Sequence, residues 1–295
     1  MTKIRISNGY RAFSLFNYLF LFTVAFLCLV PLLNVLAMSL SSSTAIQLGK
    51  VSLWPVEPTT VAYAYLIKNV KFWSALWITI QRIAIGGTLN MFLAVIVAYP
   101  LSKSSRVFPA RTKYAWYFLF TILFSGGLIP AFLVVKYTGL TNTIWSLVIP
   151  GAVPVYNVIL LLNFFRQLPG EMEEAAFIDG AGHWKTLCAI YIPTSLPALA
   201  TIGLFTLVSH WNEWFSAIIY MRRTEMYPLQ TFLQNIVIAS TFKVTNAQDV
   251  DILNKLSNRT ISSAQIFIGM MPILAVYPFL QKYFTKGIVL GSVKG

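Results

Sequence analysis

Charged residues are scarce in this sequence. Asp, Glu, Lys and Arg make up 11% of the 295 residues, whereas soluble domains carry roughly 25%. Hydrophobic residues account for 57%. This composition excludes an ordinary soluble globular protein, and the question becomes how often the chain crosses a bilayer.

Side chains that bind metals or form disulfides are also rare. The chain has two cysteines, Cys28 and Cys188, and two histidines, His183 and His210. Cys28 lies in a long apolar segment and Cys188 in a polar loop, so no disulfide is expected. His210 and Glu213 are spaced i, i+3, but one pair provides too few ligands for a metal. We therefore expect this chain to bind neither a metal nor a cofactor.

A phosphate-binding loop is missing as well. No G-x-x-x-x-G-K-[ST] pattern occurs; Gly49-Lys50 is followed by valine and lacks the upstream glycine. We predict that the chain does not hydrolyse ATP and is not an enzyme. An intramembrane enzyme using His210 and Glu213 is an alternative, but it would need a fuller set of catalytic groups, and the predicted membrane segments contain no other histidine or carboxylate.

Long apolar segments dominate the chain. A membrane-crossing helix needs about 20 mostly apolar residues, and six segments qualify: 13–40, 73–101, 114–135, 142–165, 196–221 and 263–280. The first is too long for the apolar region of a signal peptide and no clear cleavage site follows it, so we expect it to be retained. The sequence thus predicts an all-α polytopic membrane protein with six transmembrane helices.

The positions of lysine and arginine predict the orientation in the membrane. These residues precede the first segment and crowd the loop after the second, at Lys103, Arg106, Arg111 and Lys113. Cytoplasmic loops carry such an excess, so both termini should be cytoplasmic. The net charge of +13 is spread over both sides, and lipid headgroups rather than nucleic acid are the expected partner.

The predicted spans divide the chain into three parts. Residues 1–72 would comprise an N-terminal cytoplasmic segment, the first helix and an external loop. Residues 73–282 would form the core, and residues 283–295 a cytoplasmic tail. The core includes a second long external loop, 222–262, and loops of this length often carry function; a solvated connection is the alternative.

Residues 169–193, "PGEMEEAAFIDGAGHWKTLCAIYIP", interrupt the apolar pattern and form what we call the hairpin. Pro169 and Gly170 break the preceding segment, and the glutamates that follow lie where a helix dipole favours negative charge. Gly180 or Gly182 can adopt the left-handed conformation of a tight turn. Pro193 marks the junction with the fifth transmembrane segment. The residues alone leave open a surface that fits a partner's groove and a solvated pair of short helices.

The hairpin contains a spaced motif. Glu174-Ala175-Ala176, three residues, Gly180, nine residues, then Ile190-Tyr191-Ile192-Pro193 resembles the EAA motif of membrane subunits of bacterial binding-protein-dependent ABC importers, E-A-A-x3-G-x9-I-x-L-P. Ile192 replaces the preferred leucine and keeps the position apolar. The likeness extends from about Trp73 to the C-terminus. It is similar to the carbohydrate-importing branch of that family, and "HWNEWFSAIIY" resembles permeases for larger or acidic oligosaccharides such as alginate.

The resemblance implies a transport subunit in the bacterial cytoplasmic membrane. It would work by alternating access with a second permease, two ATP-binding subunits that hold ATP and Mg, and an extracytoplasmic solute-binding protein that delivers the carbohydrate. Another solute class is the alternative, and a membrane scaffold would not explain the motif's spacing. The hairpin would dock on the ATPase through Glu173, Glu174, Ala175, Ala176, Asp179, Gly180, Gly182, Ile190 and Pro193.

Several polar and aromatic residues lie within the apolar segments, where ionisable groups usually face a cavity or each other. We hypothesise that Arg82 and Glu213 pair or line the substrate route. Arg82 is the one cation placed inside a helix to attract an acidic sugar. A helix-packing network that never touches substrate is the alternative. The candidates for the route are Gln81, Arg82, His210, Trp211, Asn212, Glu213 and Trp214.

Overall fold

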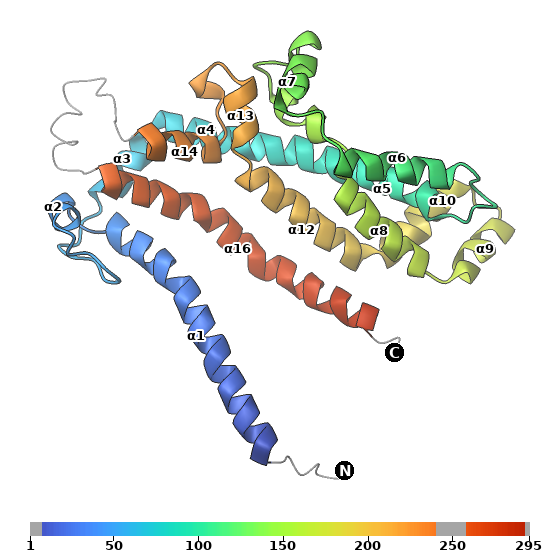
Figure 1. Ribbon diagram of the computed structural model, residues 1–295, viewed down its shortest axis with the longest axis horizontal. Coiled ribbons are helices and arrows are strands. Elements are labelled where there is room, and N and C mark those ends of the chain that lie inside the picture. The colour runs from blue at the N-terminus through green and yellow to red at the C-terminus, as the bar shows by residue number, and fades with distance from the viewer. Residues whose placement is uncertain (1–7, 240–257, 293–295) are drawn as a thin grey trace. The chain divides into compact units, whose positions relative to one another are not determined.

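The computed structural model describes residues 8–239 and 258–292, and the regular structure in these two ranges is helical throughout (Figure 1). Contacts divide the chain into two compact units. The first consists of residues 1–70 and 235–271, and the second of residues 71–234 and 272–295. The helix α16 (Asn258–Ser292) begins in the first unit and continues into the second.

The first unit begins with the apolar helix α1 (Asn8–Ser39), followed by the short helices α2 (Ser43–Gln47) and α3 (Val61–Lys68). Hydrogen bonds of serine hydroxyls connect these elements. The Ser39 hydroxyl lies 2.7 Å from the Tyr63 hydroxyl of α3, and the Ser41 hydroxyl donates to the Ala37 carbonyl and accepts from the Val56 amide. Ser42 caps α2 by accepting a hydrogen bond from the Ala45 amide.

One long helix runs through the second unit. It consists of α4 (Val70–Arg82), the π-helical turn η1 (Ile83–Gly87) and α5 (Thr88–Ser102). Together they form a candidate membrane span of 33 residues, Val70–Ser102. π-helical turns of this kind are rare and often mark functional sites.

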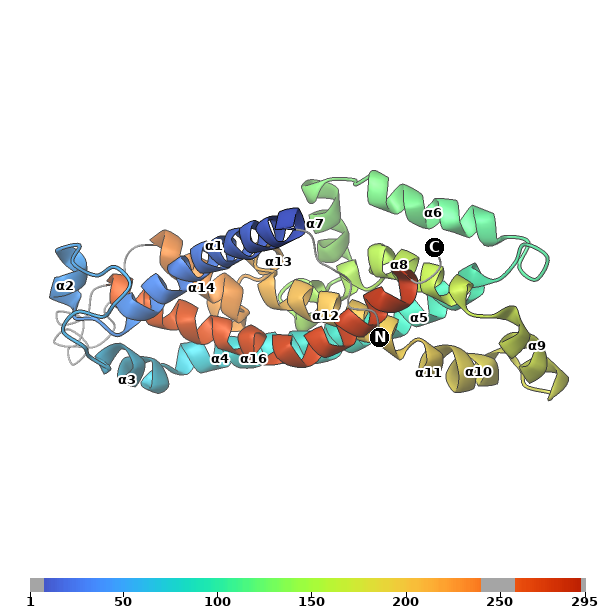
Figure 2. The same cartoon turned by 90° about the horizontal axis from the view of Figure 1, so that it is seen from below.

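The third, fourth and fifth predicted transmembrane segments, 114–135, 142–165 and 196–221, are each divided into separate helical elements. α6 (Arg111–Leu123) and α7 (Leu128–Tyr137) meet at 112° (Figure 2). The two are separated by residues 124–127, of which Gly127 has φ +86°, a conformation that glycine adopts without steric cost.

The other two breaks have different causes. Pro154 separates the 3-10 turns η2 (Ile144–Leu147) and η3 (Ile149–Gly151) from α8 (Val155–Gln167), with a bend of 46°. Proline disfavours a helical conformation in the residue before it. α12 (Leu196–Asn212) ends nine residues before the predicted limit of its segment, and a separate helix α13 (Phe215–Tyr220) follows.

By length and composition, the described residues contain three helices that could each cross a membrane: Gly9–Ser39, Val70–Ser102 and Arg259–Val276. Counting each bent pair as one span raises the number to six; the third pair is His183–Thr194 with Leu196–Asn212, bent by 81°. The last helix is longer than predicted, because α16 remains helical from Asn258 to Ser292 and includes most of the expected tail.

The core of the second unit lies where α5, α8 and α12 pack together (Figure 1). The buried side chains of this core are Ala94, Ala98, Tyr99, Leu101, Val158, Leu161, Leu162, Phe165, Leu187, Tyr191 and Ile202. A smaller apolar cluster joins α7, η2 and α13. Of the predicted external loop 222–262, the structure describes η5 (Thr224–Met226), α14 (Leu229–Ala239) and the first turn of α16, and residues 240–257 lie outside the described residues.

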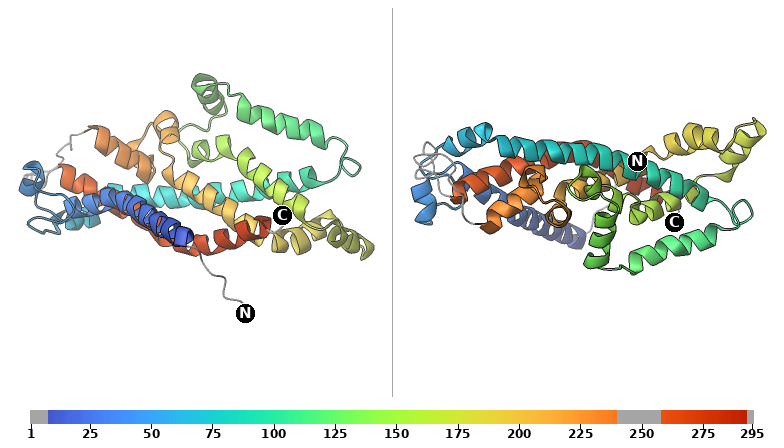
Figure 3. Two further views of the ribbon diagram at one scale, coloured as in Figure 1. Left: turned by 60° about the horizontal axis from the view of Figure 1, so that its bottom comes forward. Right: turned by 90° about the horizontal axis from the view of Figure 1, so that it is seen from above.

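The hairpin is helical, as predicted. It consists of α9 (Gly170–Ile178), α10 (His183–Thr186), the π-helical turn η4 (Leu187–Tyr191) and α11 (Ile192–Thr194). Gly180, with φ +77°, makes the turn between its two arms. The hairpin lies at the end of the second unit where α5 ends (Figures 2 and 3).

Gly86, in the π-helical turn, provides a test of the packing between η1 and α12. A Cβ atom at position 86 would lie 2.7 Å from Cε1 of His210, and His210 is hydrogen-bonded to Asn90 at 2.6 Å. We expect Gly86→Ala to destabilise the protein by about 1–3 kcal/mol, because the imidazole would have to leave that bond. Thermal unfolding of the detergent-solubilised protein measures the effect.

Gly87→Ala is the matched control, because a Cβ atom there meets its nearest neighbour, Cγ2 of Thr206, at 3.9 Å. Equal melting temperatures for the two variants would contradict this account of the packing.

Candidate functional site

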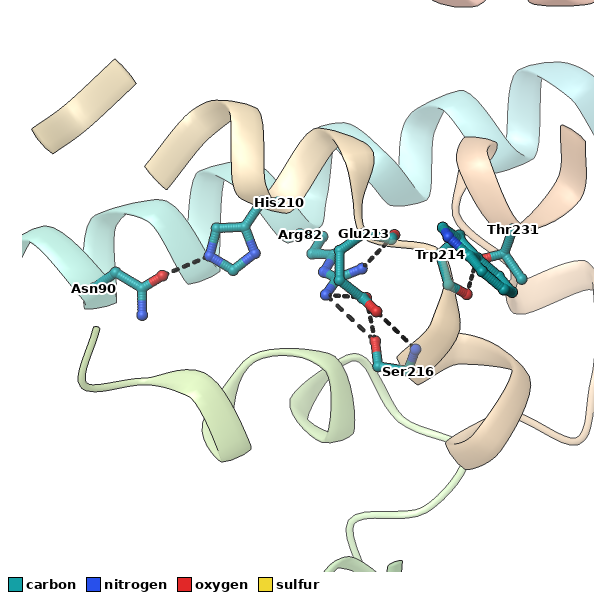
Figure 4. Close-up of polar contacts among 7 residues, drawn as sticks. All are labelled: Arg82, Asn90, His210, Glu213, Trp214, Ser216 and Thr231. Carbon is teal, nitrogen blue, oxygen red and sulfur yellow. Dashed lines mark hydrogen bonds and ion pairs between the residues drawn. The ribbon is translucent and has the colours of Figure 1, made fainter. Parts of the chain in front are cut away.

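An ion pair lies at the break between α12 and α13 (Figure 4). Nη2 of Arg82 is 2.6 Å from Oε2 of Glu213, and Nη1 of Arg82 donates to the Glu213 carbonyl oxygen at 3.0 Å. The Glu213 carboxylate also accepts hydrogen bonds from the amide, at 2.8 Å, and the hydroxyl of Ser216. The predicted pairing of Arg82 with Glu213 is therefore confirmed.

The Arg82–Glu213 pair provides hydrogen-bond partners for backbone groups between α12 and α13. A broken helix leaves carbonyl and amide groups unpaired, which is costly in the apolar region of a membrane. Arg82, which is 3% exposed, compensates one carbonyl, and Glu213 compensates the amide of Ser216 at the start of α13. Because Arg82 is already paired, it offers no free positive charge to an acidic sugar in this conformation.

A second polar contact bridges three helical elements. Nε2 of His210 lies 2.6 Å from Oδ1 of Asn90 (Figure 4). Nδ2 of Asn90 donates to the carbonyl oxygens of Gly151 and Ala152, each at 2.8 Å. Asn90 thus joins α5 to α12 and to the break before α8.

Among the described residues, no group of three or more His, Cys, Asp and Glu side chains could hold a metal.

The other candidates for the substrate route separate into buried and exposed residues. Trp211 is 5% exposed, and its indole Nε1 has no hydrogen-bond partner in the described part of the chain. Gln81, Asn212 and Trp214 are exposed. The carbonyl oxygen of Trp214 accepts a hydrogen bond from the Thr231 hydroxyl, while its ring remains accessible (Figure 4). The break therefore presents an aromatic ring and an amide beside a neutralised ion pair.

The hairpin is attached to the end of α5 by a second ion pair. Nζ of Lys103 is 2.7 Å from Oε1 of Glu173, and the Tyr191 hydroxyl donates to Oε2 of Glu173 at 2.7 Å. The ammonium also lies over two aromatic rings, 3.8 Å from the ring centroid of Tyr99 and 4.0 Å from that of Tyr191. Burial lowers the pKa of Lys103, and the hydrogen bond and charge of Glu173 act in the opposite direction.

Arginines from two other helices bind the end of α5. Nη1 of Arg111 in α6 donates to the Lys103 carbonyl at 2.9 Å, and Nη2 of Arg166 in α8 donates to the Leu101 carbonyl at 3.1 Å. These bonds satisfy carbonyls that a helix end leaves without partners and place positive charge at the negative end of the helix dipole. The end of α5 is thus bonded to α6, to α8 and, through Lys103, to the hairpin.

The structure places the predicted docking residues on different faces of the hairpin. Glu174, Ala175, Asp179, Gly180, Gly182 and Pro193 are exposed, Glu173 and Ile190 are half-buried, and Ala176 is buried. Two of the predicted docking residues have partners within the chain: Lys103 and Tyr191 bind the Glu173 carboxylate, and Ala176 is buried.

Sequence reasoning missed several residues of these two sites. Asn90, Lys103, Tyr191 and Ser216 all contribute side chains, and none was among the candidates. The position of Asn90 could have indicated a polar contact, because an amide within an apolar segment needs a hydrogen-bond partner. Lys103 gave none, because it looks like one of several basic residues in a loop.

The chain matches a known protein family. Residues 90–290 match the family described as "Binding-protein-dependent transport system inner membrane component". The chain is 37% identical over 285 residues to the polygalacturonan/rhamnogalacturonan transport system permease protein YtcP of Bacillus subtilis (strain 168), covering 97% of this chain and 99% of that protein. It is also 37% identical to the protein LplC of the same organism, over 97% of this chain and 96% of LplC.

A solved structure shares the fold over nearly the whole chain. A chain in the crystal structure of a bacterial ABC transporter involved in the import of the acidic polysaccharide alginate superposes with a TM-score of 0.87. It is 32% identical, and the match covers 96% of this chain and 100% of that chain.

The Arg82–Glu213 pair can be tested by exchanging its charges. Arg82→Glu and Glu213→Arg should each destabilise the protein by about 3–5 kcal/mol, since removing one partner leaves the other buried and unpaired. The double exchange should recover part of the lost melting temperature. A double variant no more stable than the single variants would show that the pair contributes through backbone contacts alone.

Proposed function

Because the chain belongs to the family of binding-protein-dependent transport system inner membrane components, we propose that it is a permease subunit of an ATP-driven importer that carries a carbohydrate into a bacterial cell. The observation that carries the proposal is the whole-chain likeness, with a TM-score of 0.87, to a chain of an importer of known structure. Alternating access in such a protein requires a path through the helices and a contact with the ATP-hydrolysing subunits.

The hairpin is the surface that we assign to the ATPase contact. Its exposed side chains include large apolar ones, whose removal from water by a partner would be favourable: Ile178 is 86% exposed, Trp184 68% and Phe177 40%. Glu174 and Ala175 are exposed on the same hairpin. Exposed apolar groups rimmed by charge are typical of protein interfaces. Two ATP-binding subunits would hold ATP and Mg, and a second permease subunit would complete the path.

The substrate class follows from two relatives. The YtcP protein is named for polygalacturonan and rhamnogalacturonan, and the superposed crystal structure is of an alginate importer. All three polysaccharides contain uronic acids, so we propose an acidic oligosaccharide as the substrate. Arg82 is neutralised by Glu213, so this chain would select the sugar through its shape and hydroxyls, and the solute-binding protein or the second permease would recognise its carboxylates.

Trp214 and Asn212 are the residues that we assign to the sugar. Both are exposed beside the helix break. An aromatic ring can stack on the C–H face of a pyranose, and an amide can bond its hydroxyls, which together suit a carbohydrate. The buried Arg82–Glu213 pair would hold the break that presents them.

The basic residues set the proposed orientation. Lysines and arginines cluster near the end of α5, where the hairpin also lies. By the positive-inside rule this end faces the cytoplasm, which is the side where ATP-binding subunits can reach the hairpin. We therefore place the protein in the bacterial cytoplasmic membrane with both termini inside.

The coupling role can be tested in liposomes that contain the chain with its co-purified subunits. ATP hydrolysis is measured with the solute-binding protein and, in turn, oligogalacturonate, alginate oligosaccharide and a neutral maltooligosaccharide. We expect an acidic sugar to stimulate hydrolysis, and we expect Glu174→Lys to reduce that stimulation at least about tenfold, because a charge is reversed within an interface. Failure of any ATPase to co-purify, with no sugar stimulating hydrolysis, would refute the proposal.

The sugar contact can be tested separately with Trp214→Ala. Uptake of the stimulating sugar should fall about five- to tenfold, equivalent to roughly 1–1.4 kcal/mol for the loss of one aromatic platform. The control is Trp116→Ala, which removes an exposed tryptophan from α6. Similar uptake by both variants would argue against a role for Trp214 in the path.

A further inference from the structure

Two adjacent glutamates of the hairpin have different surroundings. Glu174 is exposed. The Glu173 side chain is 18% exposed, and each of its oxygens has a partner within the chain, Lys103 for one and Tyr191 for the other. A carboxylate bonded in this way is not available to a separate subunit. The two glutamates therefore cannot share one role.

Lys103 is enclosed more completely than its partner. Its side chain is 6% exposed, and its ammonium lies between Glu173 and the rings of Tyr99 and Tyr191, which pack edge to face at 5.0 Å. A cation over an aromatic face is attracted to the ring electrons, more strongly when water is excluded. The pair is thus geometrically constrained, unlike an exposed lysine–glutamate pair.

Lys103 and Glu173 come from two elements, α5 and the hairpin, that the transport cycle must connect. Glu173 lies in the first arm of the hairpin, and Tyr191 ends the π-helical turn of its second arm. Lys103 directly follows α5. The same continuous helix contains Asn90 and, beyond η1, Arg82. A rotation of the hairpin would therefore act on the helix that holds the polar contacts at membrane depth.

A third contact supports the same connection. The Tyr99 hydroxyl of α5 lies 3.2 Å from Nδ1 of His183, at the start of the second arm. Arg111 and Arg166 hold the end of α5 to α6 and α8. Both arms of the hairpin are thus bonded to the end of α5, which is itself fixed to its neighbours.

We propose that Lys103 and Glu173, with Tyr191, are positioning residues that fix the hairpin to α5, so that force on the hairpin reaches the membrane helices, and that Glu174 alone of the two glutamates faces the ATPase. This inference rests on the proposed function for the source of the force, but the attachment itself is independent of it. Loss of the pair should increase local opening of the hairpin and should lower the amount of sugar transported per ATP hydrolysed.

The test uses the reconstituted complex with the variants Lys103→Met and Glu173→Gln. Two quantities are measured: amide hydrogen exchange of residues 170–191, and sugar transported per ATP hydrolysed. Each variant should accelerate exchange in this segment at least about fivefold, since an unpaired buried charge favours local opening, and should lower the transport ratio by a similar factor. Glu171→Gln, which removes an exposed charge from the same helix, should change neither quantity.

The double variant Lys103→Met/Glu173→Gln removes both charges and should exchange more slowly than either single variant, as expected for a buried pair. If the single variants fold poorly, Tyr191→Phe removes the hydroxyl bond to Glu173 and keeps the ring over Lys103, and it should accelerate exchange by a smaller factor. Unchanged exchange in all of these variants would overturn the proposal. Faster exchange in a complex whose native form shows no sugar-dependent hydrolysis would support the attachment and refute the proposed function.

Discussion

The need to satisfy backbone groups at membrane depth is the constraint on which this structure depends. Two of the helix breaks in the second unit are each met by a side chain from the long helix α4–η1–α5: Asn90 binds the carbonyls before α8, and Arg82 binds the carbonyl before α13. An unpaired carbonyl in hydrocarbon costs several kcal/mol. One continuous helix therefore stabilises two interrupted ones, and Asn212 and Trp214 remain exposed beside one of the breaks.

Buried positive charge occurs at two places on this helix, within it at Arg82 and directly after its end at Lys103. Arg82 and Lys103 are its buried cations, and each has a carboxylate partner from another element, Glu213 and Glu173. Buried pairs of this kind add little net stability, but breaking one is costly, which makes them suited to specifying one arrangement. The pairs therefore specify where α13 and the hairpin lie relative to the helix. Both Arg82 and Lys103 are neutralised by their carboxylate partners.

Much apolar surface remains uncovered in the described residues. On α6, the exposed fractions of Trp116, Tyr117 and Phe120 lie between 57% and 65%, and no residue of that helix is buried. Lipid and neighbouring subunits are the partners that such a helix requires, since the chain alone does not form a closed core around it. The exposed hairpin adds a surface with both polar and apolar side chains, and this is the surface that we propose contacts the ATP-hydrolysing subunits.

Composition and spacing by themselves determined the class of the protein, its approximate spans and the position of the hairpin, because these depend on local apolar length, on glycine and proline, and on a motif of set spacing. The sequence also predicted the Arg82–Glu213 pair, since two opposite charges in apolar segments need each other. Only the tertiary structure decided which way side chains point and that α12 ends at Asn212. Glycine and proline mark the bend at Gly127 and the break at Pro154, but nothing local marks the break at Glu213, whose carbonyl is bonded by Arg82, 131 residues away. Glu173 and Glu174 are neighbours of one type in one helix, and only the position of Lys103 distinguishes the one that is held inside from the one that faces out.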